Sequence, residues 1–214
     1  MADLVGLGDV LGMALAPLQD KILFLGAGWK GNMDCDLFEI EPSGGDLKML
    51  RPNFGCRLGS ISPDGSKMII RDDFSLGLAI FDIATGDTVQ LGTGLWKAAW
   101  SPDGRWIAAL HQDPPGEQPR PRPSRTIRID AHDFSQRRDM GGEDDTDVIW
   151  SPDSRYLLYS ESQPFCSHGV TLFTMDIESG KRAIVKESKC NVNYLRRIGW
   201  VSLDVLVAVG AGTP

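Results

Sequence analysis

Three aspartates are the first candidates for chemistry, because carboxylates serve as general acids and general bases. Asp64 and Asp103 stand in the tetrapeptide Ser-Pro-Asp-Gly, and Asp153 stands in Ser-Pro-Asp-Ser. A degenerate copy, Val-Ser-Leu-Asp, occupies 201–204. Proline presets φ, aspartate bonds to its own backbone and glycine accepts positive φ, so the tetrapeptide is typical of a tight turn. Because catalytic residues do not usually repeat with a scaffold, we predict that these aspartates are structural.

Metal ligation is the second possible chemistry. Asp72, His111 and Glu161 fall at equivalent positions in three successive copies of the repeat, and His168 lies in a neighbouring loop. Equivalent positions of successive units are too far apart for ligand bonds of about 2.0–2.2 Å to one ion. We therefore predict no metal site.

Nucleophilic and cofactor chemistry lack their motifs. The sequence has no Gly-x-Ser-x-Gly elbow, which serine hydrolases of the α/β type need. Gly26-Ala27-Gly28 lacks the third glycine and the following helix of a dinucleotide site. The prediction is a chain with no catalytic residues and no cofactor.

The turn motif marks a repeat with a period of roughly 40–50 residues. Trp100, Trp150 and Trp200 each precede a copy, and Ile61 precedes the first. Apolar runs rich in β-branched and aromatic residues flank the turns, as strands do. We predict that the tryptophans pack between neighbouring units.

A second hairpin completes each unit. Residues 78–83 turn into 88–91, and residues 170–177 turn into 182–185. Four strands per unit predict a propeller blade, and no longer segment has a helical period. The expected fold class is all-β: a β-propeller of four-stranded antiparallel blades, with about four full blades plus a partial fifth in a single domain, 1–214. The blades are expected at 10–53, 54–93, 94–143 and 144–194, with 195–214 and a strand at 3–8 forming the partial fifth.

The Trp-Ser-Pro-Asp-Gly turn, followed by a strand ending Asp-Ile-x-x-Gly, resembles the propeller repeat of the Tol-associated periplasmic protein family. It also resembles the propellers of the prolyl oligopeptidase and dipeptidyl peptidase group. The resemblance covers the chain from Val10 onward. It implies the fold more than the function, because enzymes, binding modules and scaffolds share this repeat. Either the chain is a small five-bladed ring or it is a fragment of a larger propeller; the ending 210–214 favours a fragment.

Composition narrows the classes of partner. The formal net charge is −7 and the pI is near 4.9, which argues against nonspecific nucleic-acid binding. No run of 18 apolar residues predicts a membrane span, and the apolar stretch 10–18 lacks the basic region and cleavage site of a signal peptide. Localisation stays open, although the resemblance and the placement of the cysteines favour the periplasm or the cell exterior.

Four cysteines flank two of the predicted hairpins. Cys35 and Cys56 bracket one, and Cys166 and Cys190 bracket the other. Because the start of one hairpin strand neighbours the end of its partner, each pair could form a disulfide, closing a loop worth about 3 kcal/mol. The alternative is four unpaired thiols that act as small apolar residues.

Charged residues before the predicted inner strands are the candidate binding site. They approach the mouth of a propeller's channel, and four of the five are basic on an acidic protein: Arg57, Lys97, Asp147, Arg196 and Arg197. A Pro/Arg-rich segment at 113–125 adds Arg120, Arg122 and Arg125, and its prolines favour an extended conformation that aromatic grooves recognise. The alternatives are solvated rim charges and a loop extension without a partner.

These features predict a noncatalytic propeller module that binds a protein or peptide through one face. The alternative is the substrate-gating propeller of a prolyl oligopeptidase-type serine peptidase whose hydrolase domain is absent from this chain. The identity of the partner and the oligomeric state are not encoded in these patterns.

Overall fold

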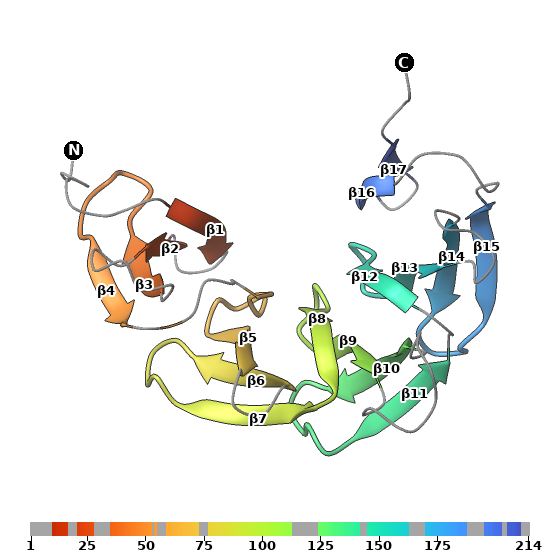
Figure 1. The fold of residues 1–214 in the computed structure, drawn as a ribbon, viewed down its shortest axis with the longest axis horizontal. Coiled ribbons are helices and arrows are strands. Elements are labelled where there is room, and N and C mark those ends of the chain that lie inside the picture. Colours follow the sequence, from red (N-terminus) through yellow and green to blue (C-terminus); the bar gives the residue numbers. More distant parts are fainter. Residues whose placement is uncertain are drawn as a thin grey trace. The chain divides into compact units, whose positions relative to one another are not determined.

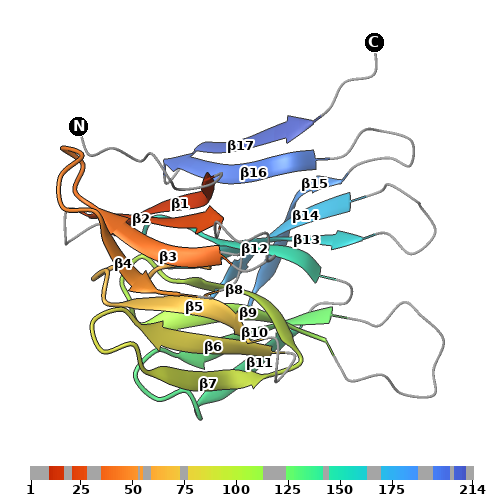
Figure 2. The same ribbon diagram turned by 60° about the vertical axis from the view of Figure 1, so that its left-hand side comes forward.

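A computed structural model describes residues 10–16, 21–27, 35–52, 54, 59–72, 77–112, 124–141, 145–162, 170–187, 195–202 and 205–210. Within these ranges all regular structure is β-strand, and every strand pairs antiparallel to its neighbour (Figures 1 and 2). The chain divides into two compact units, Met1–Thr93 and Gly94–Pro214. The all-β antiparallel prediction is confirmed.

The first unit contains two sheets. One has four strands in the order β1-β2-β3-β4: β1 (Val10–Ala16), β2 (Lys21–Ala27), β3 (Cys35–Ile40) and β4 (Lys48–Arg51). The other has three strands in the order β5-β6-β7: β5 (Lys67–Asp72), β6 (Gly77–Asp82) and β7 (Thr88–Thr93).

The three-stranded sheet differs from the expected four strands. The chain still runs beside β5, because the Ile69 N–H donates to the Ser60 carbonyl at 2.9 Å and Ile61 forms an isolated bridge with Met68. Residues 55–58, near the start of the expected blade 54–93, lie outside the described residues. The first strand of this blade is therefore a single bridge in the described part.

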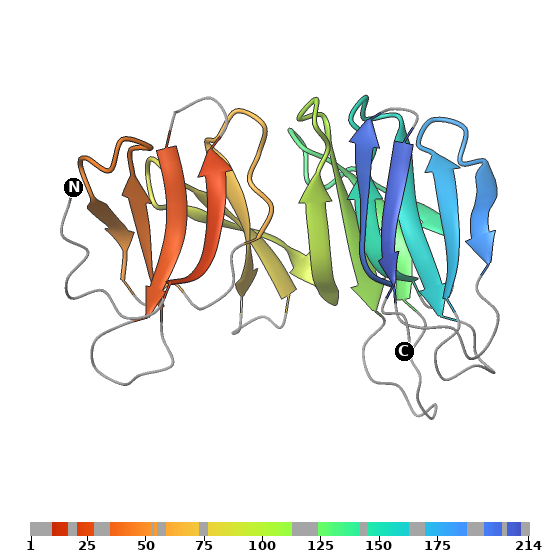
Figure 3. The same cartoon turned by 90° about the horizontal axis from the view of Figure 1, so that it is seen from above.

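The second unit contains two four-stranded sheets and a hairpin. The first sheet comprises β8 (Leu95–Trp100), β9 (Trp106–Gln112), β10 (Ser124–Asp130) and β11 (Arg137–Gly141). The next comprises β12 (Asp145–Trp150), β13 (Tyr156–Ser162), β14 (Val170–Asp176) and β15 (Arg182–Glu187). The hairpin pairs β16 (Leu195–Ser202) with β17 (Val205–Gly210), drawn in dark blue in Figure 3.

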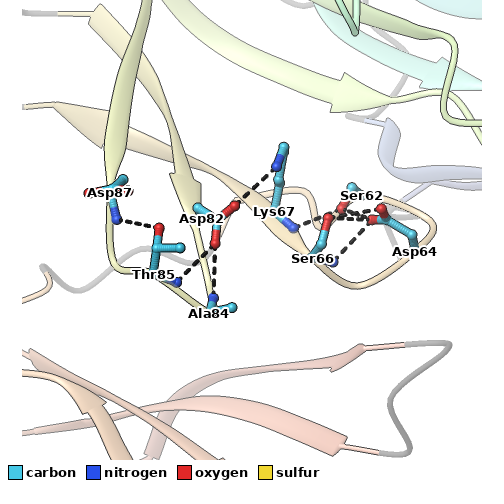
Figure 4. Close-up of polar contacts among 8 residues, drawn as sticks. All are labelled: Ser62, Asp64, Ser66, Lys67, Asp82, Ala84, Thr85 and Asp87. Carbon is cyan, nitrogen blue, oxygen red and sulfur yellow. Dashed lines mark hydrogen bonds and ion pairs between the residues drawn. The ribbon is translucent and has the colours of Figure 1, made fainter.

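The Ser-Pro-Asp turn joins the first and second strands by the same bonds in each copy. In the β12–β13 turn the Ser151 hydroxyl donates to the Asp153 carboxylate at 2.5 Å and accepts the Tyr156 N–H at 2.8 Å. The Ser62 and Ser101 turns repeat both bonds at 2.6 and 2.9 Å. All three serines are buried, and Figure 4 shows the Ser62 turn with Asp64. The structural role predicted for the motif aspartates is confirmed.

A second aspartate caps the turn between the third and fourth strands. The Asp176 carboxylate accepts the backbone N–H groups of Glu178 and Ser179 at 3.2 and 2.9 Å. Asp82 accepts those of Ala84 and Thr85 in the same way (Figure 4). Hydrogen bonds to the charged form favour that form. The bonds from Ser179 and from the Arg155 guanidinium therefore lower the pKa of Asp176 from 3.8 to about 2.

Apolar side chains fill the space between successive sheets within each unit. In the second unit Trp150 lies in a cluster with Leu110 and Met140 of the preceding sheet, and its indole N–H donates to the Ala99 carbonyl at 2.9 Å. Trp100 and Trp150 are 8% and 6% exposed, so the predicted burial of these two rings is confirmed. The Trp200 side chain lies outside the described residues.

Trp150→Ala should destabilise the protein by about 3–5 kcal/mol, because two packed sheets cannot collapse into the cavity it leaves. It also removes the donor that satisfies the Ala99 carbonyl. Urea unfolding followed by circular dichroism measures the loss. The control is Trp96→Ala at a ring that is 42% exposed; equal destabilisation by both changes would contradict the packing role of Trp150.

The capping aspartates predict a loss of stability in acid. Because the folded-state pKa of Asp176 lies below 3.8, its contribution is complete above the unfolded value and is lost as pH falls toward about 2. Asp176→Asn keeps the oxygen acceptor but removes this titration, so its unfolding free energy should depend less on pH between about 5 and 2. The control is Asp87→Asn, on a turn where Asp87 contributes its backbone N–H to Thr85. Equal slopes for Asp176→Asn and the parent would contradict the argument.

Candidate binding face

The first strands of the second unit share an irregularity at the ends where they begin. One extra residue interrupts the pairing of β8 with β9, of β12 with β13 and of β16 with β17: Trp96, Thr146 and Arg196. Such β-bulges re-aim side chains and are frequent beside functional sites. We call these three strand ends, residues 95–97, 145–147 and 195–197, the bulged ends.

Four of the predicted site residues lie at the bulged ends. Lys97 in β8, Asp147 in β12 and Arg197 in β16 each resume the pairing after the extra residue, opposite Leu110, Ser160 and Val209. Arg196 is itself an extra residue. The fold therefore gives three of these charged residues the same register position, and the fourth stands beside it. Arg57, Arg120 and Arg122 lie outside the described residues.

Trp96 lies at the bulged ends but was not among the residues that the sequence patterns singled out. The apolar run 95–100 predicted a strand, and within that strand Leu95 is 2% exposed whereas Trp96 is 42% exposed. The extra residue breaks the alternation of a regular strand, which turns this ring outward. The only sequence signal was that Trp96 precedes a charged residue at the position where Arg196 precedes Arg197.

Gly94 fixes the backbone just before Trp96. Its φ is +72°, and a Cβ there would lie 2.8 Å from the Gln112 carbonyl oxygen and 3.0 Å from His111 Nε2. Its own carbonyl accepts the Gln112 N–H at 2.9 Å. Only glycine allows the backbone to come this close to Gln112 and His111 without moving them. The close contact and the hydrogen bond fix the backbone position at the start of the bulge.

The structure places Arg125 differently from the sequence prediction. It was assigned to the Pro/Arg-rich loop at 113–125, but it lies within β10 and pairs with His111 of β9. Its guanidinium forms an ion pair with Asp139 Oδ2 at 3.2 Å, with the two side chains 41% and 49% exposed. An arginine that forms an ion pair with the neighbouring strand is less available for a ligand than an arginine in a loop, and such exposed pairs add little stability. Residues 113–123 lie outside the described residues.

One of the four cysteines is described. Cys35, at the start of β3, is fully buried and disulfide-bonded. The Phe54 N–H donates to the Cys35 carbonyl at 2.6 Å, which places the chain two residues before Cys56 beside Cys35. Cys56, Cys166 and Cys190 lie outside the described residues.

No group of three or more histidine, cysteine or acidic side chains in the described ranges could hold a metal ion. No described helix is long and apolar enough to cross a membrane. Of the charged and aromatic residues at the bulged ends, the structure describes the side chains of Trp96 and Lys97, and Trp96 is 42% exposed.

No family model matches the sequence, and no curated protein matches it. Solved structures do. A TolB from Acinetobacter baumannii superposes with a TM-score of 0.62 at 18% identity, over 86% of this chain and 44% of that one. A putative TolB from Agrobacterium tumefaciens gives 0.58 at 17%, over 78% and 61%. A prolyl endopeptidase gives 0.68 at 12%, over 92% and 32%.

The sheets are β-propeller blades. TolB and the prolyl endopeptidase share them with this chain, as the Ser-Pro-Asp repeat predicted. The chain spans less than two thirds of the length of each of these three proteins. At identities below 20% the likeness establishes the fold, and the chemistry of the site must come from this chain's own residues.

The pairing of the four cysteines can be determined by experiment. Peptide mapping of the unreduced protein should find Cys35 linked to Cys56 and Cys166 linked to Cys190, because each pair brackets one hairpin. The reduced and alkylated protein, in which both linked peptides disappear, is the control. A bridge from Cys35 to Cys166 or Cys190 would refute the pairing.

Proposed function

We propose that the chain is a noncatalytic propeller module that binds a protein or peptide, and that the bulged ends carry the contact. The observation behind this proposal is a contrast between the two ends of the blades. The Ser-Pro-Asp turns keep the same residues and bonds in three copies. The bulged ends keep the backbone irregularity but change its residues from Trp-Lys to Thr-Asp to Arg-Arg.

This contrast favours recognition at the bulged ends. Packing requires the same residues in every turn. At the bulged ends the backbone conformation recurs but the side chains differ, so one scaffold presents different chemical groups. Binding residues concentrate on such variable positions held by rigid elements. Trp96 adds an anchor of the type enriched at binding hot spots, and the neighbouring cations give charge selectivity.

The second candidate is the gating propeller of a prolyl oligopeptidase-type serine peptidase. The similarity to the prolyl endopeptidase over 92% of this chain favours it. Labelling of the native protein, purified from its source, with a fluorophosphonate probe separates the two candidates. A labelled serine would support the peptidase, whereas the binding module has none.

Charge reversal at the bulged ends should weaken partner binding without changing the melting temperature. A photo-crosslinking amino acid at position 96 captures the partner in cells, and its affinity is then measured in vitro. Lys97→Glu combined with Arg197→Glu should lower that affinity about tenfold or more at low salt, with a smaller effect at high salt.

The matched control reverses two cations near the turns between third and fourth strands. Lys48→Glu combined with Lys181→Glu makes the same change in net charge, and both residues are exposed. Equal weakening by both double variants would show that net charge acts at long range and that the bulged ends are not the contact. Turnover of a peptide by the purified chain would contradict the noncatalytic proposal.

A further inference from the structure

Two arginines lie directly opposite each other in the sheet β8–β11. Arg128 of β10 pairs with Arg138 of β11, at the second pair on the turn side of the irregularity between these strands. Like charges directly opposite each other on neighbouring strands are destabilising. The corresponding pair in the sheet β1–β4 is Glu39 with Lys48, whose opposite charges form an ion pair at 3.6 Å. The blade therefore does not require two cations at this position.

A third arginine approaches this pair from the Ser-Pro-Asp turn. The guanidinium carbon of Arg105 lies 5.6 Å from the centre of the Trp106 ring, and that of Arg128 lies 4.1 Å from the same ring. The Arg105 backbone is fixed, because its N–H donates to the Asp103 carboxylate at 3.1 Å and its carbonyl accepts the Ala131 N–H at 3.0 Å. The arginine cluster, as we call it, consists of Arg105, Arg128, Arg138 and the Trp106 ring.

The arginine cluster forms no ion pair within the described part of the chain. Arg128 and Arg138 donate hydrogen bonds to backbone carbonyls instead, to Ile177 at 3.1 Å and to Glu178 at 3.4 Å. Each guanidinium has five N–H donors, so most donors of the cluster are not bonded to the described protein. Other arginines of this unit do have carboxylate partners: Arg125 pairs with Asp139, and Arg155 pairs with Asp176.

Repulsion within the cluster acts on its half-buried member. Burial lowers the pKa of Arg128, and the charges of Arg138 and Arg105 lower it further, whereas the carboxylates of Glu178 and Asp130 raise it. The Asp130 carboxylate accepts two backbone N–H groups of its own turn, and Glu178 is exposed. An anion bound at the cluster would relieve the repulsion among the three guanidinium groups.

Packing within the repeat does not explain the cluster. In the two remaining sheets with third and fourth strands, the two opposed positions hold uncharged residues: Ile80 opposite Val89, and Thr174 opposite Ala183. The position of Arg105 holds Ser66 after the first Ser-Pro-Asp turn and Arg155 after the third. Arg155 is in an ion pair with Asp176 at 3.1 Å. One blade therefore gathers cations that the repeated scaffold does not need.

We propose that the arginine cluster binds a phosphate group. Guanidinium N–H groups form planar forks that match phosphate oxygens. A phosphate carries about two negative charges near pH 7 and at least three strong acceptor oxygens, so it can accept from several arginines at once, whereas a carboxylate has one charge and two oxygens. The cluster belongs to the ends of the blade that carry the Ser-Pro-Asp turn, so this site is distinct from the bulged ends.

Calorimetric titration of the full chain with sodium phosphate at constant ionic strength, at about pH 7.5, tests the site. The parent should bind phosphate saturably and sodium acetate more weakly. Arg138→Gln should weaken phosphate binding about fivefold or more, because it removes a charge-assisted donor. Its melting temperature in chloride should not fall, since the change also removes a like charge opposite Arg128. An arginine that only held the turn at Glu178 would give the opposite result in chloride.

Arg137→Gln is the matched control. Arg137 is exposed and neighbours Arg138, but it pairs with Ile129 and so belongs to the other face of the sheet. This variant should keep phosphate affinity within about twofold, while Glu178→Gln should increase it because a competing carboxylate is removed. No saturable binding by the parent, equal losses in Arg138→Gln and Arg137→Gln, or acetate binding as tight as phosphate binding would each overturn the proposal.

A second probe distinguishes the source of the phosphate. The peptide Gly-Gly-phosphoserine-Gly-Gly with blocked termini carries one phosphoryl group and no other charge. Tighter binding of this peptide than of inorganic phosphate would assign the site to a phosphorylated protein, and weaker binding would assign it to the free anion; both results uphold the site. Lys97→Glu with Arg197→Glu should leave phosphate binding unchanged, so failure of the bulged ends and failure of this site can be told apart.

Discussion

A serine hydroxyl buried in a turn holds the first two strands of the repeated blades in register. In each copy it accepts the N–H of a residue five positions later and donates to the aspartate two positions later. A buried hydroxyl without such partners would cost about 1–3 kcal/mol. The two bonds therefore disfavour other pairing registers of the two strands. A slip of one residue would turn every apolar side chain to the wrong face, and both the packing between blades and the bulge at the far end of the first strand depend on this register.

One copy shows how closely this turn is constrained. Gly65 and Gly104 have φ of 71° and 74°, and Ser154 takes their place with a φ of 61°. That conformation is costly for a residue with a Cβ. The Ser154 hydroxyl accepts the Asp103 N–H at 2.9 Å, which ties the turn of one blade to the turn of the next. Serine in place of glycine makes this positive φ less favourable, but it adds a hydrogen bond between two blades.

Much of the fold could be read from the sequence because its local signals agree. The Ser-Pro-Asp turn, the tryptophan before it and the strand ending in aspartate and isoleucine each specify one step of the blade, and the structure has those steps. The first strand of the second blade could not be read, because the expected strand is reduced in the described part to the bridge at Ile61. Its sequence around Gly59 lacks the alternating β-branched residues that a regular strand needs.

The sequence predicted the charged residues of the candidate site but not the backbone bulge on which they lie, and the reason is physical. The charged residues could be placed near the starts of the inner strands, because position in a repeat fixes position along a blade. The bulge could not be foreseen, since an extra residue leaves no mark on composition or periodicity in so short a strand. Trp96 was therefore not among the predicted site residues. Arg125 was assigned to the loop because prolines precede it, although Ser124 is buried and already belongs to the strand. Backbone irregularities of this kind become visible only when the register of the paired strands is known.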